Sequence, residues 1–161
     1  MPDFPVDGVL FRDITPLLAR GDLFQAAIRE MAGWFKDTTV DIIAGVEARG
    51  FCIGAAIAFE MGVGFVPIRK IGKLPRSTHR ATYALEYGES AIEIHRDALD
   101  QGDQVLVVDD VLATGGTMGA AIRLVEDSGA SVAGTAVLIE LKDLGARARI
   151  GPHACHALIQ Y

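Results

Sequence analysis

Two adjacent carboxylates, Asp109 and Asp110, are the residues best suited to chemistry, because they follow an apolar run and precede a loop of small residues. Residues 105 to 117 read VLVVDDVLATGGT. Open parallel sheets bind their ligands at the carboxyl ends of the strands, where this pattern places both aspartates. The backbone N–H groups of residues 113 to 117, followed by a helix N-terminus, can surround an anion. The segment therefore predicts a phosphate-binding loop beside two carboxylates.

The same segment excludes two common phosphate motifs. No lysine follows the glycines, so this is not a nucleoside-triphosphate P-loop, and the G-x-G-x-x-G pattern of dinucleotide sites is missing. Carboxylates beside a phosphate repel it unless they bind a diol or a cation. A ligand with a phosphate, a vicinal diol and magnesium meets these conditions. The alternative is a structural role, in which the acids end a strand and the glycines turn the chain.

Positive charge is concentrated in one part of the chain. Five of its 15 lysines and arginines are Arg69, Lys70, Lys73, Arg76 and Arg80. A solvated turn is the alternative interpretation of such a run. The chain as a whole is acidic, with 21 Asp and Glu and a net charge of -6, so this concentration favours a clamp for a polyanion. The acidic balance argues against nucleic acid as a partner.

The elements that must position these groups alternate between strand and helix. Short, wholly apolar strands are typical of a parallel sheet covered on both faces, so we expect an α/β fold. A chain of 161 residues predicts a single domain, 1–161. We predict strands at 41–46, 63–68, 104–109, 131–140 and 154–161, helices at 21–36, 49–61 and 117–128, a loop at 69–80, and an antiparallel ribbon at 82–87 and 91–95.

Two other features favour structural interpretations. Residues 51–68 contain one ionisable side chain, but glycines and a proline interrupt them, so we predict a buried helix and strand rather than a membrane span. His153, Cys155 and His156 have no second ligand pair at zinc-like spacing. With two cysteines and no secretory signal at the start, we expect a cytoplasmic protein with no membrane partner.

Residues 107 to 117 resemble the phosphoribosyl pyrophosphate signature of the type I phosphoribosyltransferases. Further matches, in order from residue 3 to about 120, narrow the resemblance to the adenine phosphoribosyltransferases. They are residues 3–5 (DFP) with 8–14 (GVLFRDI) for the N-terminal segment, 44–51 (AGVEARGF) for the pyrophosphate loop, and 67–75 (PIRKIGKLP) with 83–88 (YALEYG) for the mobile loop and hood.

This resemblance implies a type I phosphoribosyltransferase fold, with helices on both faces of a parallel sheet. A small hood would be formed in part by residues 1–20 and the C-terminal part. It implies purine salvage, in which adenine and phosphoribosyl pyrophosphate give AMP and pyrophosphate. Mg2+ would be the cofactor, held mainly through the substrate rather than by direct protein ligands. A homodimer is also implied, since in the family the arginine at the position of Arg69 can reach the neighbouring subunit's site.

The resemblance also gives each candidate residue a role. The 5′-phosphate would bind Ala113, Thr114, Gly115, Gly116 and Thr117, the ribose Asp109 and Asp110, the pyrophosphate Arg49, Arg69, Lys70 and Lys73, and adenine Leu10, Phe11 and Arg12. Glu86 would be the acid/base that handles the purine proton, and Tyr87 would cover the site as part of the hood.

The identity of the base depends on position 113. Related enzymes for 6-oxopurines carry an aspartate there that serves the purine N7, whereas Ala113 has no proton to exchange. This favours adenine, with Glu86 taking over the proton. The alternatives are a 6-oxopurine or other phosphoribosyltransferase, and a regulator that binds phosphoribosyl pyrophosphate without catalysis.

Overall fold

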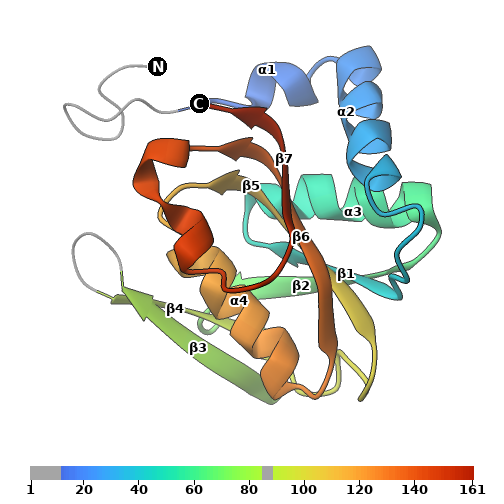
Figure 1. The fold of residues 1–161 in the computed structure, drawn as a ribbon. Helices are drawn as coiled ribbons and strands as arrows, with labels where there is room; N and C mark the ends of the chain where they lie inside the picture. The colour runs from blue at the N-terminus through green and yellow to red at the C-terminus, as the bar shows by residue number, and fades with distance from the viewer. Residues whose placement is uncertain (1–11, 85–88) are drawn as a thin grey trace.

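A computed structural model describes residues 12–84 and 89–161 of the chain (Figure 1). The described residues form one seven-stranded sheet with the strand order β3-β4-β2-β1-β5-β6-β7. The parallel part consists of β2 (Gly64–Lys70), β1 (Ile42–Val46), β5 (Gln104–Leu112), β6 (Ser131–Glu140) and β7 (Cys155–Gln160). Beyond β2, the sheet continues as an antiparallel pair, β4 (Glu89–His95) and β3 (Thr78–Ala84).

Helices cover both faces of this sheet, as Figure 1 shows. One face carries α2 (Gly21–Gly33) and α3 (Arg49–Met61), and the other carries α4 (Gly116–Asp127). The short α1 (Thr15–Leu18) precedes α2, and two 3-10 turns, η1 (Lys142–Leu144) and η2 (Ala146–Ala148), follow β6. Among the described residues, no helix is both long and apolar enough to cross a membrane. The arrangement confirms the α/β fold expected from the sequence.

Strand β5 lies between two hydrophobic cores. Its side chains alternate between the faces of the sheet, as in any strand. Val105 and Val107 pack into the core that includes α4, whereas Leu106 and Val108 pack into the core beneath α2 and α3. All four side chains are fully buried. The strand that leads to the paired aspartates therefore has no face toward solvent, which explains its uninterrupted apolar sequence.

The loop predicted at residues 69–80 is shorter in the structure. Strand β2 continues to Lys70 and β3 begins at Thr78, so residues 71–77 alone connect them. The prediction was wrong at both ends. At the first end, Arg69 and Lys70 pair with β4 and so extend β2. At the other, β3 is an edge strand in which only Ala81 is buried, so no hydrophobic alternation marks it. Pairing with β4, from Thr78 opposite His95 onward, defines the strand instead. The ribbon is antiparallel as predicted.

The first turn of α3 packs directly against the end of β5. A Cβ atom at Gly50 would lie 2.9 Å from the carbonyl oxygen of Val108 and 3.0 Å from Oδ1 of Asp109. The backbone of a buried central strand cannot move aside easily, so only glycine fits at this position. This close approach places Arg49, the first residue of α3, beside the paired aspartates.

We expect Gly50→Ala to lower the free energy of unfolding by about 1–3 kcal/mol, because the added methyl group overpacks the contact with β5. Urea denaturation measures the difference. The matched control is Gly33→Ala, since a Cβ at the end of α2 would meet no atom within 4 Å. Alanine prefers the helix, so the control should be at least as stable as the wild type. Equal stability of the two variants would contradict a fixed α3–β5 contact.

Candidate active site

A cavity of about 510 Å³ lies at the carboxyl ends of the parallel strands. It brings together segments that are far apart in the sequence and that carry residues predicted to bind phosphate, ribose, pyrophosphate and base. Its walls are formed by Arg12, Glu47, Ala48, Arg49, Lys70, Tyr83, Asp109, Asp110, Val111, Ala113, Thr117 and Leu141.

The predicted phosphate loop connects β5 to α4. Gly115 adopts a φ of +82°, and α4 begins at the next residue. Glycine reaches positive φ without steric strain. Here the turn also leaves no space for a side chain, since a Cβ at Gly115 would lie 2.7 Å from the carbonyl oxygen of Ala146. Ala113 and Thr117 line the cavity. The positive end of the α4 dipole therefore lies at the cavity wall, as an anion site requires.

An ion pair holds the segment that contacts the phosphate loop. Glu140, the last residue of β6, is 2% exposed and accepts hydrogen bonds from Nε and Nη2 of Arg147 at 2.6 and 2.7 Å. Gln160 of β7 donates a third hydrogen bond at 3.0 Å. The Arg147 guanidinium keeps the pKa of Glu140 below its usual value, so this carboxylate is ionised. The pair holds the η2 turn, with Ala146 in it, against Gly115.

The paired aspartates are buried, with exposures of 8% for Asp109 and 6% for Asp110. Oδ1 of Asp109 accepts the backbone N–H of Asp110 at 2.9 Å, and Nε of Arg49 donates to Oδ2 of Asp110. Burial, reinforced by the charge of Asp110, raises the pKa of Asp109 well above its usual value. Two adjacent negative charges are unfavourable in this environment. Hydroxyl groups of a ligand, or a cation, would therefore stabilise the two carboxylates.

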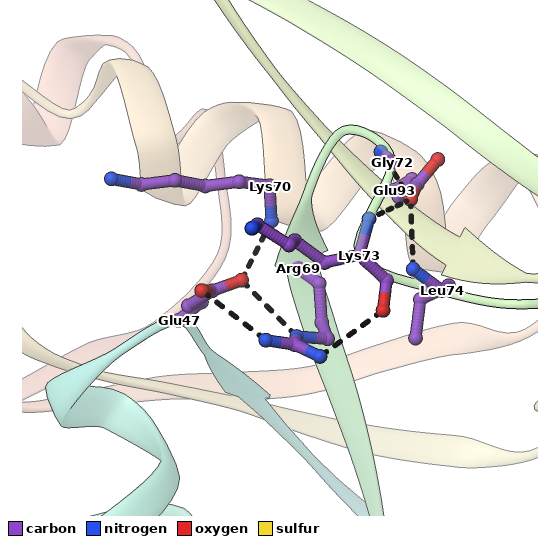
Figure 2. Close-up of polar contacts among 7 residues, drawn as sticks. All are labelled: Glu47, Arg69, Lys70, Gly72, Lys73, Leu74 and Glu93. Carbon is purple, nitrogen blue, oxygen red and sulfur yellow. Dashed lines mark hydrogen bonds and ion pairs between the residues drawn. The ribbon is translucent and has the colours of Figure 1, made fainter.

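The four cations predicted for pyrophosphate fall into two pairs. Arg49 and Lys70 line the cavity, whereas Arg69 and Lys73 are not among its lining residues. Figure 2 shows where Arg69 lies instead. Its guanidinium donates to Oε2 and Oε1 of Glu47 at 3.2 and 3.4 Å, and to the backbone carbonyl of Lys73 at 3.1 Å. Arg69 is thus held next to the cavity wall by a residue of that wall.

Glu47 is a site residue to which the sequence analysis assigned no role. Besides binding Arg69, it accepts the backbone N–H of Lys70 at 2.9 Å. Burial acts to raise the pKa of Glu47, but the Lys70 N–H and the Arg69 guanidinium outweigh it and lower that pKa. The signal in the sequence is its position directly after β1, on the same side of the sheet as the aspartates in the last part of β5.

Tyr83 was matched as part of residues 83–88 but given no role of its own, and Glu93 was missed. Tyr83 lines the cavity from β3, and Glu93 is an acid between two buried isoleucines of β4, with 1% exposure. A carboxylate inside an apolar strand is unusual, because burying it requires hydrogen bonds or a counter-charge. That contrast is the signal by which Glu93 could have been found.

The residues predicted to bind the base are only partly described. Arg12 lines the cavity, and its guanidinium carbon lies 3.7 Å from the ring centroid of Tyr161, a cation–π contact. The other residues predicted for base binding, proton transfer and the hood, namely Leu10, Phe11, Glu86 and Tyr87, lie outside the described residues.

The histidines near the C-terminus make structural contacts. His156 stacks on Trp34 with ring centroids 5.4 Å apart, and His153 lies 3.2 Å from a carboxylate oxygen of Glu126. Within residues 12–84 and 89–161, no three His, Cys, Asp or Glu side chains are grouped as a metal site.

The chain is similar to known proteins over nearly its whole length. Residues 18–155 match the model of the phosphoribosyl transferase domain family. The adenine phosphoribosyltransferase of Salinispora arenicola is 54% identical over 159 residues, which cover 99% of this chain and 85% of the relative. The crystal structure of the adenine phosphoribosyltransferase from Thermoanaerobacter pseudethanolicus is 45% identical, with a TM-score of 0.98, and the match covers 100% of this chain and 94% of that one.

A third relative was solved with ligands. The adenine phosphoribosyltransferase of Saccharomyces cerevisiae, complexed with D-2,5-dideoxy-2,5-imino-altritol 1,6-bisphosphate and adenine, is 39% identical. Its TM-score is 0.93, and the match covers 98% of this chain and 92% of that one. The family match therefore spans β1 to β6 and the loops that form the cavity. From this match and these relatives, the chain belongs to the phosphoribosyl transferase family and, within it, to the adenine phosphoribosyltransferases.

Proposed function

We propose that the protein catalyses, in this cavity, the transfer of the phosphoribosyl group from phosphoribosyl pyrophosphate to adenine, giving AMP and pyrophosphate in purine salvage. One observation carries the proposal: a single cavity combines two buried carboxylates, the positive end of α4, and the cations Arg49 and Lys70. This is the set of groups needed to hold a sugar diol, a phosphate and a second polyanion at once.

The ribose phosphate binds at the end of β5. Residues 113–117 hold the 5′-phosphate with backbone N–H groups, and Asp109 and Asp110 bind the ribose hydroxyls. Their negative charge stabilises the positive charge that develops on the ribose as pyrophosphate leaves. The ligand of the yeast relative, an imino sugar carrying two phosphates, supports a site for a phosphorylated sugar ring.

Pyrophosphate binds on the side of α3 and β2. Arg49 and Lys70 contact it from the cavity wall, and Arg69 of β2 and Lys73 of the adjoining turn add positive charge beside it. Arg49 contacts Asp110 in this structure, so it stands between the ribose carboxylates and the pyrophosphate. From that position its guanidinium can bind the leaving group while still offsetting the charge of the aspartates.

The base is adenine. Leu10, Phe11 and Arg12 hold its ring and edge, and of these Arg12 lines the cavity. Glu86 handles the proton of the purine imidazole, and Tyr87 covers the site. Ala113 lines the cavity at the position where the enzymes for 6-oxopurines carry an aspartate, and alanine cannot exchange a proton with the base. The adenine bound in the yeast relative supports the same base.

Mg2+ is the cofactor. Two buried carboxylates that share one arginine are oxygen donors of the kind Mg2+ takes, and they leave most of its coordination to phosphate and hydroxyl oxygens. Mg2+ would be held mainly through the substrate, and Asp109 and Asp110 would act on it through the ribose hydroxyls that they bind. The ion would supply positive charge that offsets the negative charge of the pyrophosphate group.

The enzyme is a cytoplasmic homodimer. Phe59 on α3 is 90% exposed, and the exposed Cys52 and Ala55 lie on the same side of that helix. An apolar face of this kind supports burial against a second copy. Cys52 and Cys155 are both free thiols, which supports a reducing compartment.

Adenine, phosphoribosyl pyrophosphate and Mg2+ should yield AMP with the purified chain, whereas hypoxanthine, guanine and orotate should give no nucleotide. Liquid chromatography of the products measures this. Turnover of hypoxanthine but not of adenine would contradict the assignment of adenine as the base, and binding of phosphoribosyl pyrophosphate without turnover of any base would indicate a regulator.

In the same assay, Glu86→Gln should lower kcat about a hundredfold or more, because it removes the acid/base, while the Kd for phosphoribosyl pyrophosphate stays near the wild-type value.

Asp109→Asn should raise thermal stability at neutral pH while lowering kcat/KM by about a hundredfold or more, because the buried charge serves the transition state and not the fold. A raised pKa in the folded state means that the wild type loses stability as pH rises from the usual aspartate range through the raised value. The gain in Tm should therefore vanish at low pH. Asp110→Asn, which removes the ion pair between Asp110 and Arg49, is the control and should show no gain.

Phe59→Glu should convert the dimer to a monomer, because a charged side chain cannot be buried in an apolar interface. Sedimentation velocity gives the mass of each form. Glu60→Gln, which changes the neighbouring exposed residue on α3, should remain dimeric. A monomeric wild type would refute the homodimer.

A further inference from the structure

The end of β2 and the turn that follows it are held by two carboxylates, Glu47 and Glu93 (Figure 2). Glu47 binds the Lys70 N–H and the Arg69 side chain on the cavity side. On the other side, Oε1 of Glu93 accepts three successive backbone N–H groups, from Gly72 at 2.8 Å, Lys73 at 3.2 Å and Leu74 at 3.3 Å. The backbone of the turn thus folds around one carboxylate oxygen.

The second oxygen of Glu93 has partners of its own. Oε2 accepts a hydrogen bond from the Thr78 hydroxyl at 3.1 Å and lies 3.3 Å from Nε of Arg80. With 1% of Glu93 exposed, these groups replace water around the carboxylate. Burial acts to raise the pKa of Glu93, but the Leu74 N–H, the Thr78 hydroxyl and the other donors outweigh it and lower that pKa. Glu93 is therefore ionised and binds its donors strongly.

Three of the cations assigned to pyrophosphate lie in this turn or directly before it: Lys73 in the turn, and Arg69 and Lys70 at the end of β2. Strand pairing places Arg69 opposite Glu93, and Lys70 follows as the last residue of β2 and lines the cavity. The carbonyl of Lys73 accepts a hydrogen bond from Arg69, which in turn binds Glu47 of the cavity wall. A continuous set of contacts thus leads from the Glu93 carboxylate to the wall of the cavity.

We propose that Glu93 is a positioning residue for phosphoribosyl transfer, one that holds residues 71–74 in place so that the cations beside them meet pyrophosphate without further ordering. The inference rests on the proposed function. Glu93 does not line the cavity, so it acts through the turn and not on the substrate. A turn that is ordered in advance loses less conformational entropy when the polyanion binds, which lowers the KM for phosphoribosyl pyrophosphate and leaves adenine binding unaffected.

Glu93→Leu is the main test, because leucine keeps the volume of the side chain in β4 and removes both acceptor oxygens. We expect the KM for phosphoribosyl pyrophosphate to rise about tenfold, with the KM for adenine unchanged and a smaller change in kcat. Hydrogen exchange followed by mass spectrometry should show faster exchange at the amides of residues 72–74. Glu93→Gln keeps one carbonyl oxygen for those amides and should restore both readouts most of the way.

Asp97→Asn is the matched control. Asp97 binds Arg76 of the same connection at 2.7 Å, but both side chains are more than 60% exposed, so the pair contributes little. This variant should leave both KM values and the exchange rates unchanged. Glu93→Asp, a carboxylate one methylene shorter, gives the same change in weaker form and replaces the leucine variant if that protein does not fold.

Two outcomes would overturn the proposal. One is faster exchange at residues 72–74 without a change in the KM for phosphoribosyl pyrophosphate, which would make Glu93 a structural residue only. The other is an equal rise in both KM values, which would indicate general damage to the site. Failure of the proposed function itself is seen separately, as absence of AMP formation by the wild type, and it leaves the exchange measurement intact.

Discussion

The burial of negative charge around the cavity is the constraint on which the rest of the structure depends. Four carboxylates with side-chain exposures of 16% or less each pair with an arginine from a different element: Asp110 with Arg49, Glu47 with Arg69, Glu93 with Arg80, and Glu140 with Arg147. A buried carboxylate is stable only when such a partner is in place. Helix α3, strands β2 and β3 and the η2 turn are therefore all fixed relative to charges at this edge of the sheet.

This pairing also explains how an acidic chain can receive polyanions. The four arginines remain 32% to 62% exposed at their side chains, so each offsets an internal charge and still presents donors to solvent. Asp109 differs, because it shares Arg49 with Asp110 and its pKa is raised by burial. The net charge of -6 describes the whole chain, whereas substrate binding depends on where these groups lie.

The sequence predicted the features that are formed by residues close together in the chain. The apolar strand, the paired aspartates and the glycine turn are contiguous, so their order and their closeness could be predicted from residues 105–117 alone. The partners of Glu93 depend on the β2–β4 register, which is set by a strand more than twenty residues away. The start of β3 could not be recognised because an edge strand with one buried residue has no periodic signal. Leu10 and Glu86 lie outside the described residues, so their roles stay predictions.

The contact between Gly115 and Ala146 has a consequence for divergence among related enzymes. The loop that we propose to bind phosphate is shaped on one side by its own glycine and on the other by a turn thirty-one positions later in the chain. A bulkier or shifted η2 turn would press on the loop although no residue of the signature had changed. Affinity for the phosphate can thus be tuned from outside the motif by which such enzymes are recognised, and two chains with identical signatures need not bind phosphate equally well.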